Sequence, residues 1–146
     1  MSLAALARHM AAAASRAQAA EQQALEAAGA MVEQEARGML GEYQPAAGPF
    51  PRWADLQDST IRDRLRQGYT ANDPLLRSGE MRDTIHHEVR DSTVFVFSRD
   101  PKAAHHEFGT RKMPARPFLG PAMVRRLDDA GREIAARAFA SLMRGS

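Results

Sequence analysis

Apolar residues in the N-terminal quarter of the chain recur mostly at three- and four-residue steps, the spacing of one face of an α-helix. The stripe is narrow and rich in alanine, which favours helix formation but buries little area per side chain. It predicts one helix over residues 2 to about 38, spanning roughly 50 Å, which should project or pack on another chain. A frayed N-terminus followed by a shorter helix from about Glu21 fits the same pattern. The stripe comprises Leu3, Leu6, Met10, Ala13, Ala17, Ala24, Ala28, Val32 and Ala36.

The helical pattern ends where prolines and glycines crowd residues 41–52. Their density predicts an irregular loop, because neither residue type sustains a regular element. Such a loop either folds over the core or waits for a partner. Trp53 and Leu56 are expected to anchor its far end.

A short helix is predicted next, over residues 60–67. Asp58 or Ser59 is suited to cap its beginning, and Gly68 is suited to end it. Residues 72–74 then indicate a turn.

The period changes to two in residues 84–90, which places Ile85, His87 and Val89 on one face of a strand. Asp91 and Ser92 suit a tight turn. Residues 93–98 return as a β-prone strand that is apolar on both faces, so we expect both faces to be covered. Together the two strands predict an antiparallel hairpin.

Helical spacing returns at the C-terminal end and predicts a helix over residues 121–144, with Pro121 in its first turn and Gly145 ending it. The fold class is therefore α+β, with a long N-terminal helix and a C-terminal helix packed on a small antiparallel β-sheet. The apolar stripe of this last helix comprises Val124, Leu127, Ala130, Ile134, Ala138 and Leu142.

Neither a repeat nor a linker divides the chain, so we expect a single domain over residues 1–146. Its parts are a long helix that is free to project (1–40), an irregular loop (41–52), a core with the hairpin and a docking motif (53–120) and the C-terminal helix (121–144).

The composition of the chain mainly excludes classes of site and function. The chain has no cysteine, which excludes disulfides, thiolate metal sites and cysteine nucleophiles. No run approaches the roughly 20 apolar residues of a membrane span, and charged residues interrupt the N-terminal apolar run, so no signal peptide is expected. A net charge of +2 is too small to indicate a dedicated nucleic-acid binder by itself.

The triplet His-His-Glu occurs twice, at residues 86–88 and 105–107, and raises the question of a metal site. Adjacent residues of a strand point to opposite faces, so neither histidine pair offers both rings to one ion. No nucleophile motif or glycine-rich phosphate loop is present either. We therefore expect no metal, no cofactor, no catalytic residue and no enzymatic activity.

Arginine-rich surfaces leave DNA binding open as an alternative. Arg111, Lys112 and Arg116 form a small basic cluster that could face DNA. Arg62, Arg64 and Arg66 lie among acidic residues, which favours a salt-bridged surface over a nucleic-acid interface.

The segment EFGTRKMPARPFLGPAM, residues 107–123, resembles a signature of the phage tail-completion and virion-morphogenesis proteins, neck and minor tail components similar to lambda gpZ and Mu gpG. Phe108-Gly109-Thr110 and the run Pro114–Leu119 match it residue by residue. Residues 53–85 also resemble the family, through Trp53, Leu56, Thr60, Gly68 and the run PLLRSGEMRDTI. His105 and His106 have no counterpart in the signature, so their role is not inherited.

The resemblance implies a structural virion protein that completes the tail at the neck. We expect a homo-oligomeric ring, a hexamer by analogy with tail symmetry, built from heterologous contacts. The implied partners are the protein itself, the head-closure protein, the tail terminator, the tail tube and the genomic DNA in the channel, with no membrane. The implied location is the neck or tail of the virion, with assembly in the host cytoplasm.

Pro114 and Pro117 restrict the backbone around Arg116, which suggests a rigid arm that docks on a neighbour. The alternative is that Phe118 and Leu119 fill the domain's own core. The predicted subunit or partner interface comprises Phe108, Gly109, Thr110, Arg111, Lys112, Pro114, Arg116, Pro117, Phe118 and Leu119. Of these, Arg111, Lys112 and Arg116 would face DNA in the alternative function.

Overall fold

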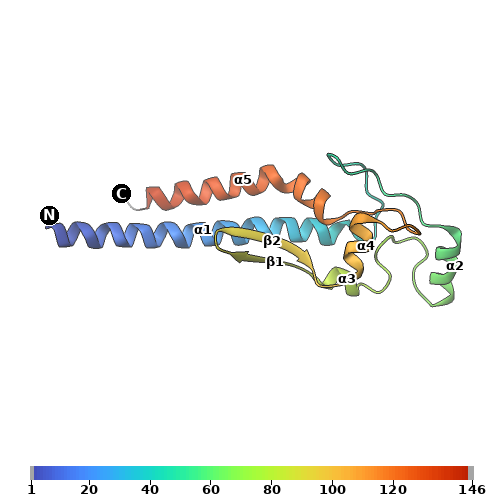
Figure 1. Cartoon of the computed structure of the whole chain (residues 1–146). Coiled ribbons are helices and arrows are strands. Elements are labelled where there is room, and N and C mark those ends of the chain that lie inside the picture. The colour runs from blue at the N-terminus through green and yellow to red at the C-terminus, as the bar shows by residue number, and fades with distance from the viewer. Residues whose placement is uncertain (1, 145–146) are drawn as a thin grey trace.

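Figure 1 shows a computed structural model of the chain, which describes residues 2–144, as an elongated molecule organised along one helix. Helix α1 runs without a break over Leu3–Met39, 37 residues, or about 55 Å at 1.5 Å per residue. The Ser2 hydroxyl caps it by accepting a hydrogen bond from the Ala5 amide at 3.0 Å. The prediction of one long helix is confirmed, and the shorter helix from Glu21 is excluded.

Helix α5, Leu119–Met143, returns antiparallel to α1, so the two ends of the chain lie at the same end of the molecule (Figure 1). Its predicted apolar stripe is largely wrong, because Leu127 and Leu142 are 61% and 72% exposed. The residues that α5 buries are Pro121, Ala122 and Ala130. The helix is therefore rotated so that small residues meet the alanine face of α1. Gly145, predicted to end this helix, lies outside the described residues.

The hairpin of β1, Ile85–Arg90, and β2, Thr93–Ser98, is confirmed in position and register, with Val89 opposite Val94. It lies along α1 (Figure 1) and approaches it closely at Gly29, where a Cβ atom would lie 2.7 Å from side-chain atoms of His87 and Val94. A glycine at this point therefore allows strand and helix to pack.

Coverage of both hairpin faces was expected and is wrong. Phe95 is 43% exposed, and the Arg90 guanidinium lies over its ring, 4.8 Å from the centroid. A second arginine, Arg99, lies 5.9 Å from the ring centroid of Phe97. The outward aromatic rings are thus covered in part by arginines in and next to the hairpin rather than by a second layer of structure.

Three short helices complete the fold, of which only α2, Asp58–Arg66, was predicted. Gln57 occupies its N-cap position without a side-chain hydrogen bond, so the cap expected from Asp58 or Ser59 is wrong. Helices α3, Glu80–Asp83, and α4, Lys102–Phe108, were not predicted. The second His-His-Glu triplet lies in α4, so the alternation of side chains along a strand does not apply to it.

The hydrophobic core lies where the C-terminal half of α1 meets the hairpin, α4 and the start of α5. Trp53 fills it with 1% exposure, and its indole Nε1 donates to the Pro117 carbonyl at 2.8 Å. The loop before Trp53 folds over the core: a Cβ added at Gly120 would lie 2.3 Å from the Phe50 ring. The core cluster comprises Val32, Ala36, Met39, Leu40, Trp53, Leu75, Met81, Ile85, Ala103, Phe118 and Ala122.

Candidate functional site

Glu107 organises the segment that resembles the phage signature, by capping α5 from a distance. Its carboxylate accepts hydrogen bonds from the amides of Phe118 at 2.8 Å, Leu119 at 3.0 Å and Gly120 at 2.8 Å. The next residue is Pro121, which has no amide hydrogen to satisfy. The amides that a helix start usually leaves without partners are therefore accounted for by one side chain from α4.

A tight turn follows α4 and carries the basic tip of the segment. Gly109 begins it at φ 74°, and a Cβ there would lie 2.9 Å from the Ala115 amide nitrogen. Thr110 and Met113 exchange backbone hydrogen bonds, at 2.8 Å and 3.3 Å. Arg111 and Lys112 lie between them, exposed to solvent.

Arg116 lies inside the protein instead of on a docking arm. It is 5% exposed, and its Nε and Nη2 atoms donate to the carbonyls of Ala54 and Asp55, both at 2.9 Å. Burial away from water lowers the pKa of the Arg116 guanidinium from its ordinary value, while nearby Tyr43 and Asp55 act in the opposite direction. The expectation that Arg116 faces DNA or a partner is therefore corrected.

The predicted interface set divides into three groups by burial. Phe118 is fully buried, which supports its reading as a core residue, and Pro117 is buried beside it. Burial removes these two and Arg116 from the surface available to a partner. Phe108 is 82% exposed. The other exposed members are Thr110, Arg111, Lys112 and Pro114, while Gly109 and Leu119 are half-buried.

A second surface is the helical arm, which we define as residues 3–23 of α1 and 131–143 of α5. The first buried residue of α1 is Ala24, and the last of α5 is Ala130. Large apolar side chains are exposed along the arm, each at least 43%: Leu3, Leu6, Met10, Phe139, Leu142 and Met143. These side chains leave apolar area in water that a partner would cover.

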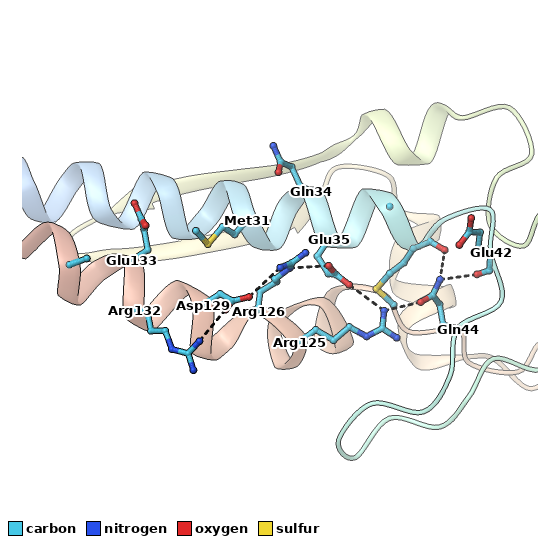
Figure 2. A pocket seen from close by; sticks show the side chains of 13 residues that line it. Met31, Gln34, Glu35, Glu42, Gln44, Arg125, Arg126, Asp129, Arg132 and Glu133 are labelled. Carbon is cyan, nitrogen blue, oxygen red and sulfur yellow. Dashed lines mark hydrogen bonds and ion pairs between the residues drawn. The ribbon is translucent and has the colours of Figure 1, made fainter.

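An ionic seam joins α1 and α5 alongside the core, beside a pocket of about 730 Å³. In Figure 2, Glu35 of α1 reaches Arg125 at 3.3 Å and Arg126 at 3.0 Å, and Arg126 also reaches Asp129 at 3.2 Å. The Asp129 and Glu35 hydrogen bonds raise the pKa of Arg126. Because the alanine contacts alone bury little area, these pairs help to fix the register of α5 on α1.

Among the histidines, the contacts of His87 give it a structural role. His87 places Nδ1 against the Glu33 carboxylate and Nε2 3.1 Å from Glu26, which ties β1 to α1. His106 is half-buried, and burial, with Arg116 nearby, lowers its pKa from 6.5. No group of three or more metal-ligating side chains gathers within residues 2–144.

Sequence reasoning did not find Glu107 as a cap or Glu35 as the centre of the ionic seam. A capping box is recognisable because its residues are local, whereas Glu107 acts on amides more than ten residues later in the chain. Glu35 and its arginines are about ninety residues apart. No local pattern marks either contact.

A family model for the phage virion morphogenesis family matches residues 2–134. The chain belongs to the phage virion morphogenesis family. The chain is also similar to "Mu-like prophage FluMu G protein 1" of Haemophilus influenzae, with 28% identity over 91 residues. The aligned part is 62% of this chain and 61% of that relative, so the chain spans less than two thirds of the relative's length.

No solved structure matches the chain. Within residues 2–144 no helix has a stretch apolar and long enough to cross a membrane. The family match thus covers α1, the segment around Glu107 and α5 as far as residue 134.

Proposed function

We propose that this protein is a non-enzymatic structural component of a tailed-phage virion, a tail-completion or neck protein that forms a ring at the head–tail junction. Its neighbours would be the head-closure protein, the tail terminator and the tail tube, with DNA passing through the channel. Family membership supports the assembly role. The ring and its place at the neck rest on the surfaces of the fold and on the resemblance of the signature segment.

The observation that carries the proposal is the helical arm. It extends well beyond the core, and Leu3 and Leu142 are 87% and 72% exposed at its end. In a ring, each subunit presents one face to a different face of the next. An elongated pair of helices with exposed apolar side chains supplies one such face. The exposed Phe108, with the basic turn of residues 109–113, supplies a candidate for the other.

Ring assembly is tested by measuring molar mass against concentration, by light scattering and sedimentation without DNA. We expect a multiple of the 16.0 kDa chain that grows with concentration. Met10→Glu, at an exposed apolar position, should raise the concentration for half-assembly by about tenfold or more. Gln23→Glu introduces the same charge on the opposite side of the same helix and should leave assembly unchanged.

DNA binding remains the second candidate because Arg111 and Lys112 are exposed at the tip of a rigid turn and form no ion pair within the described residues. Binding to phosphates would weaken steeply with added salt. A chain that stays monomeric at the highest soluble concentration and retards DNA would favour this function over the ring. If the Met10→Glu and Gln23→Glu variants assemble equally well, the helical arm is not part of the ring interface.

A further inference from the structure

A second pocket, of about 720 Å³, lies where α2, α4 and the basic turn meet, at the end of the molecule opposite the chain termini (Figure 1). Its wall includes Arg64 from α2, His106 from α4 and Arg116 from the segment before α5. The pocket is distinct from the helical arm and from the ionic seam, but it shares Lys112 with the turn that we propose as the second face of the ring.

Two guanidinium groups of the pocket wall are buried without a carboxylate partner. Arg64 and Arg116 are 6% and 5% exposed, and neither forms an ion pair with any described residue. Their hydrogen bonds go to backbone carbonyls, those of Asp73, Ala54 and Asp55. Most of their N–H donors thus have no protein acceptor within residues 2–144, and the nitrogen atoms without one remain accessible to solvent. The nearby carboxylates of Asp73 and Asp55 favour the charged forms of Arg64 and Arg116 without pairing with them.

The charges in the pocket act on one another in a way that indicates their proximity. Burial and then the charge of Arg77 lower the pKa of Arg64, and Arg116 adds to this effect, while Asp73 and Tyr43 oppose it. His106 also responds to Arg116, and its Nδ1 atom is buried with no hydrogen-bond partner among the described residues. An acceptor placed between these groups would satisfy several donors at once.

The rest of the lining carries charges of both signs. Asp63 also lines the pocket, but it is already paired with Arg66 at 2.6 Å and Arg77 at 3.3 Å. Lys102 and Lys112 stand at the exposed rim, and their ammonium groups form no ion pair in the described part of the chain. Three further carboxylates belong to the lining, those of Asp55, Glu80 and Asp100.

We propose that this pocket binds a carboxylate side chain from an acidic segment of another protein chain, held by Arg64 and Arg116 with Lys102 and Lys112 at the entrance. A carboxylate matches the fork of N–H donors on a guanidinium. An extended protein segment can insert one side chain between two buried arginines. The phosphates of a duplex are fixed to a wide rod and reach only the exposed lysines.

The test uses the full-length chain with isotope-labelled histidine rings, the His106 signal being assigned through His106→Gln. The probe is a short blocked peptide of glutamate and glycine, compared with its glutamine counterpart at equal ionic strength. We expect the glutamate peptide to move the His106 signal saturably and the glutamine peptide to leave it in place. Binding should also raise the pH at which this ring titrates, since a nearby anion favours the imidazolium form.

Arg64→Gln should weaken binding of the glutamate peptide by about tenfold or more, because it removes a buried charge partner. Arg62→Gln makes the same change on an exposed residue of α2 that does not line the pocket and should bind as the unchanged protein does. If Arg64→Gln unfolds, Lys102→Gln at the exposed rim replaces it, with about threefold weaker binding expected. The proposal is overturned if the two peptides move the His106 signal equally. It is also overturned if the matched variants bind the glutamate peptide equally well, or if duplex DNA moves the His106 signal.

Discussion

Replacing Glu107 tests whether one carboxylate on α4 holds the start of α5 in place. The substitution Glu107→Ala removes the acceptor of three amide hydrogen bonds, those of Phe118, Leu119 and Gly120. Losing an ordinary N-cap side chain costs about 0.5–2 kcal/mol, and a negative charge at a helix N-terminus contributes about 0.3–1 kcal/mol more. Because Glu107 is half-buried and serves several amides, we expect a loss of about 3 kcal/mol.

A graded series separates the charge from the hydrogen bonds. Glu107→Gln keeps one acceptor oxygen and loses the charge, so its free energy of unfolding should fall by about 1 kcal/mol. Glu21→Ala, an exposed glutamate of α1, is the control and should stay within about 0.5 kcal/mol of the unchanged protein. Urea unfolding followed by circular dichroism gives all three values.

Hydrogen exchange locates the effect on the molecule. The amides of Phe118, Leu119 and Gly120 should exchange faster in Glu107→Ala than in the unchanged protein, since their acceptor is gone. If Glu107→Ala is as stable as Glu21→Ala and these amides exchange as before, Glu107 does not cap α5.

The remaining predictions concern burial, close packing and pH. Arg116→Ala should lower the free energy of unfolding by about 3 kcal/mol, because two carbonyl groups lose their donor. Arg111→Ala at the exposed turn should change it by no more than about 0.5 kcal/mol, and thermal melts compare the two variants. Gly29→Ala should destabilise by about 1–3 kcal/mol by pushing the hairpin off α1, whereas Gly38→Ala, which meets nothing within 4 Å on the same helix, should stabilise by up to about 1 kcal/mol. The pKa of His106 is lowered from 6.5 in the folded state, so on acidification the unfolded chain binds a proton at this ring first. The free energy of unfolding should therefore fall as pH drops below about 6.5, and His106→Gln should flatten that part of the stability–pH curve.

Periodicity alone determined the elements with strong local signals. The long helix over Leu3–Met39 and the hairpin with its turn at Asp91 and Ser92 lie where the sequence placed them. Alanine at helical spacing and β-branched or aromatic residues around a two-residue turn favour these structures locally. The resemblance of the signature segment likewise pointed to the family that the comparison confirms.

Contacts between distant parts of the chain decided which residues are buried. The apolar stripe of α5 was read from spacing, but Leu127 is exposed while Ala122 is buried, since the close approach of α1 admits only small side chains. Arg116 looked like a surface cation and is buried, because carbonyls about sixty residues earlier accept its donors.

The segment around Glu107 shows most clearly where local reasoning ends. Its residue types were evident in the sequence, and their match to the phage signature was sufficient to suggest the family. Only the tertiary structure divides them into an exposed part, with Phe108 and the basic turn, and a buried part that joins Arg116 to the core. The physical reason is that a cap, a buried cation and a core phenylalanine each depend on partners contributed by other elements, which no single stretch of sequence contains.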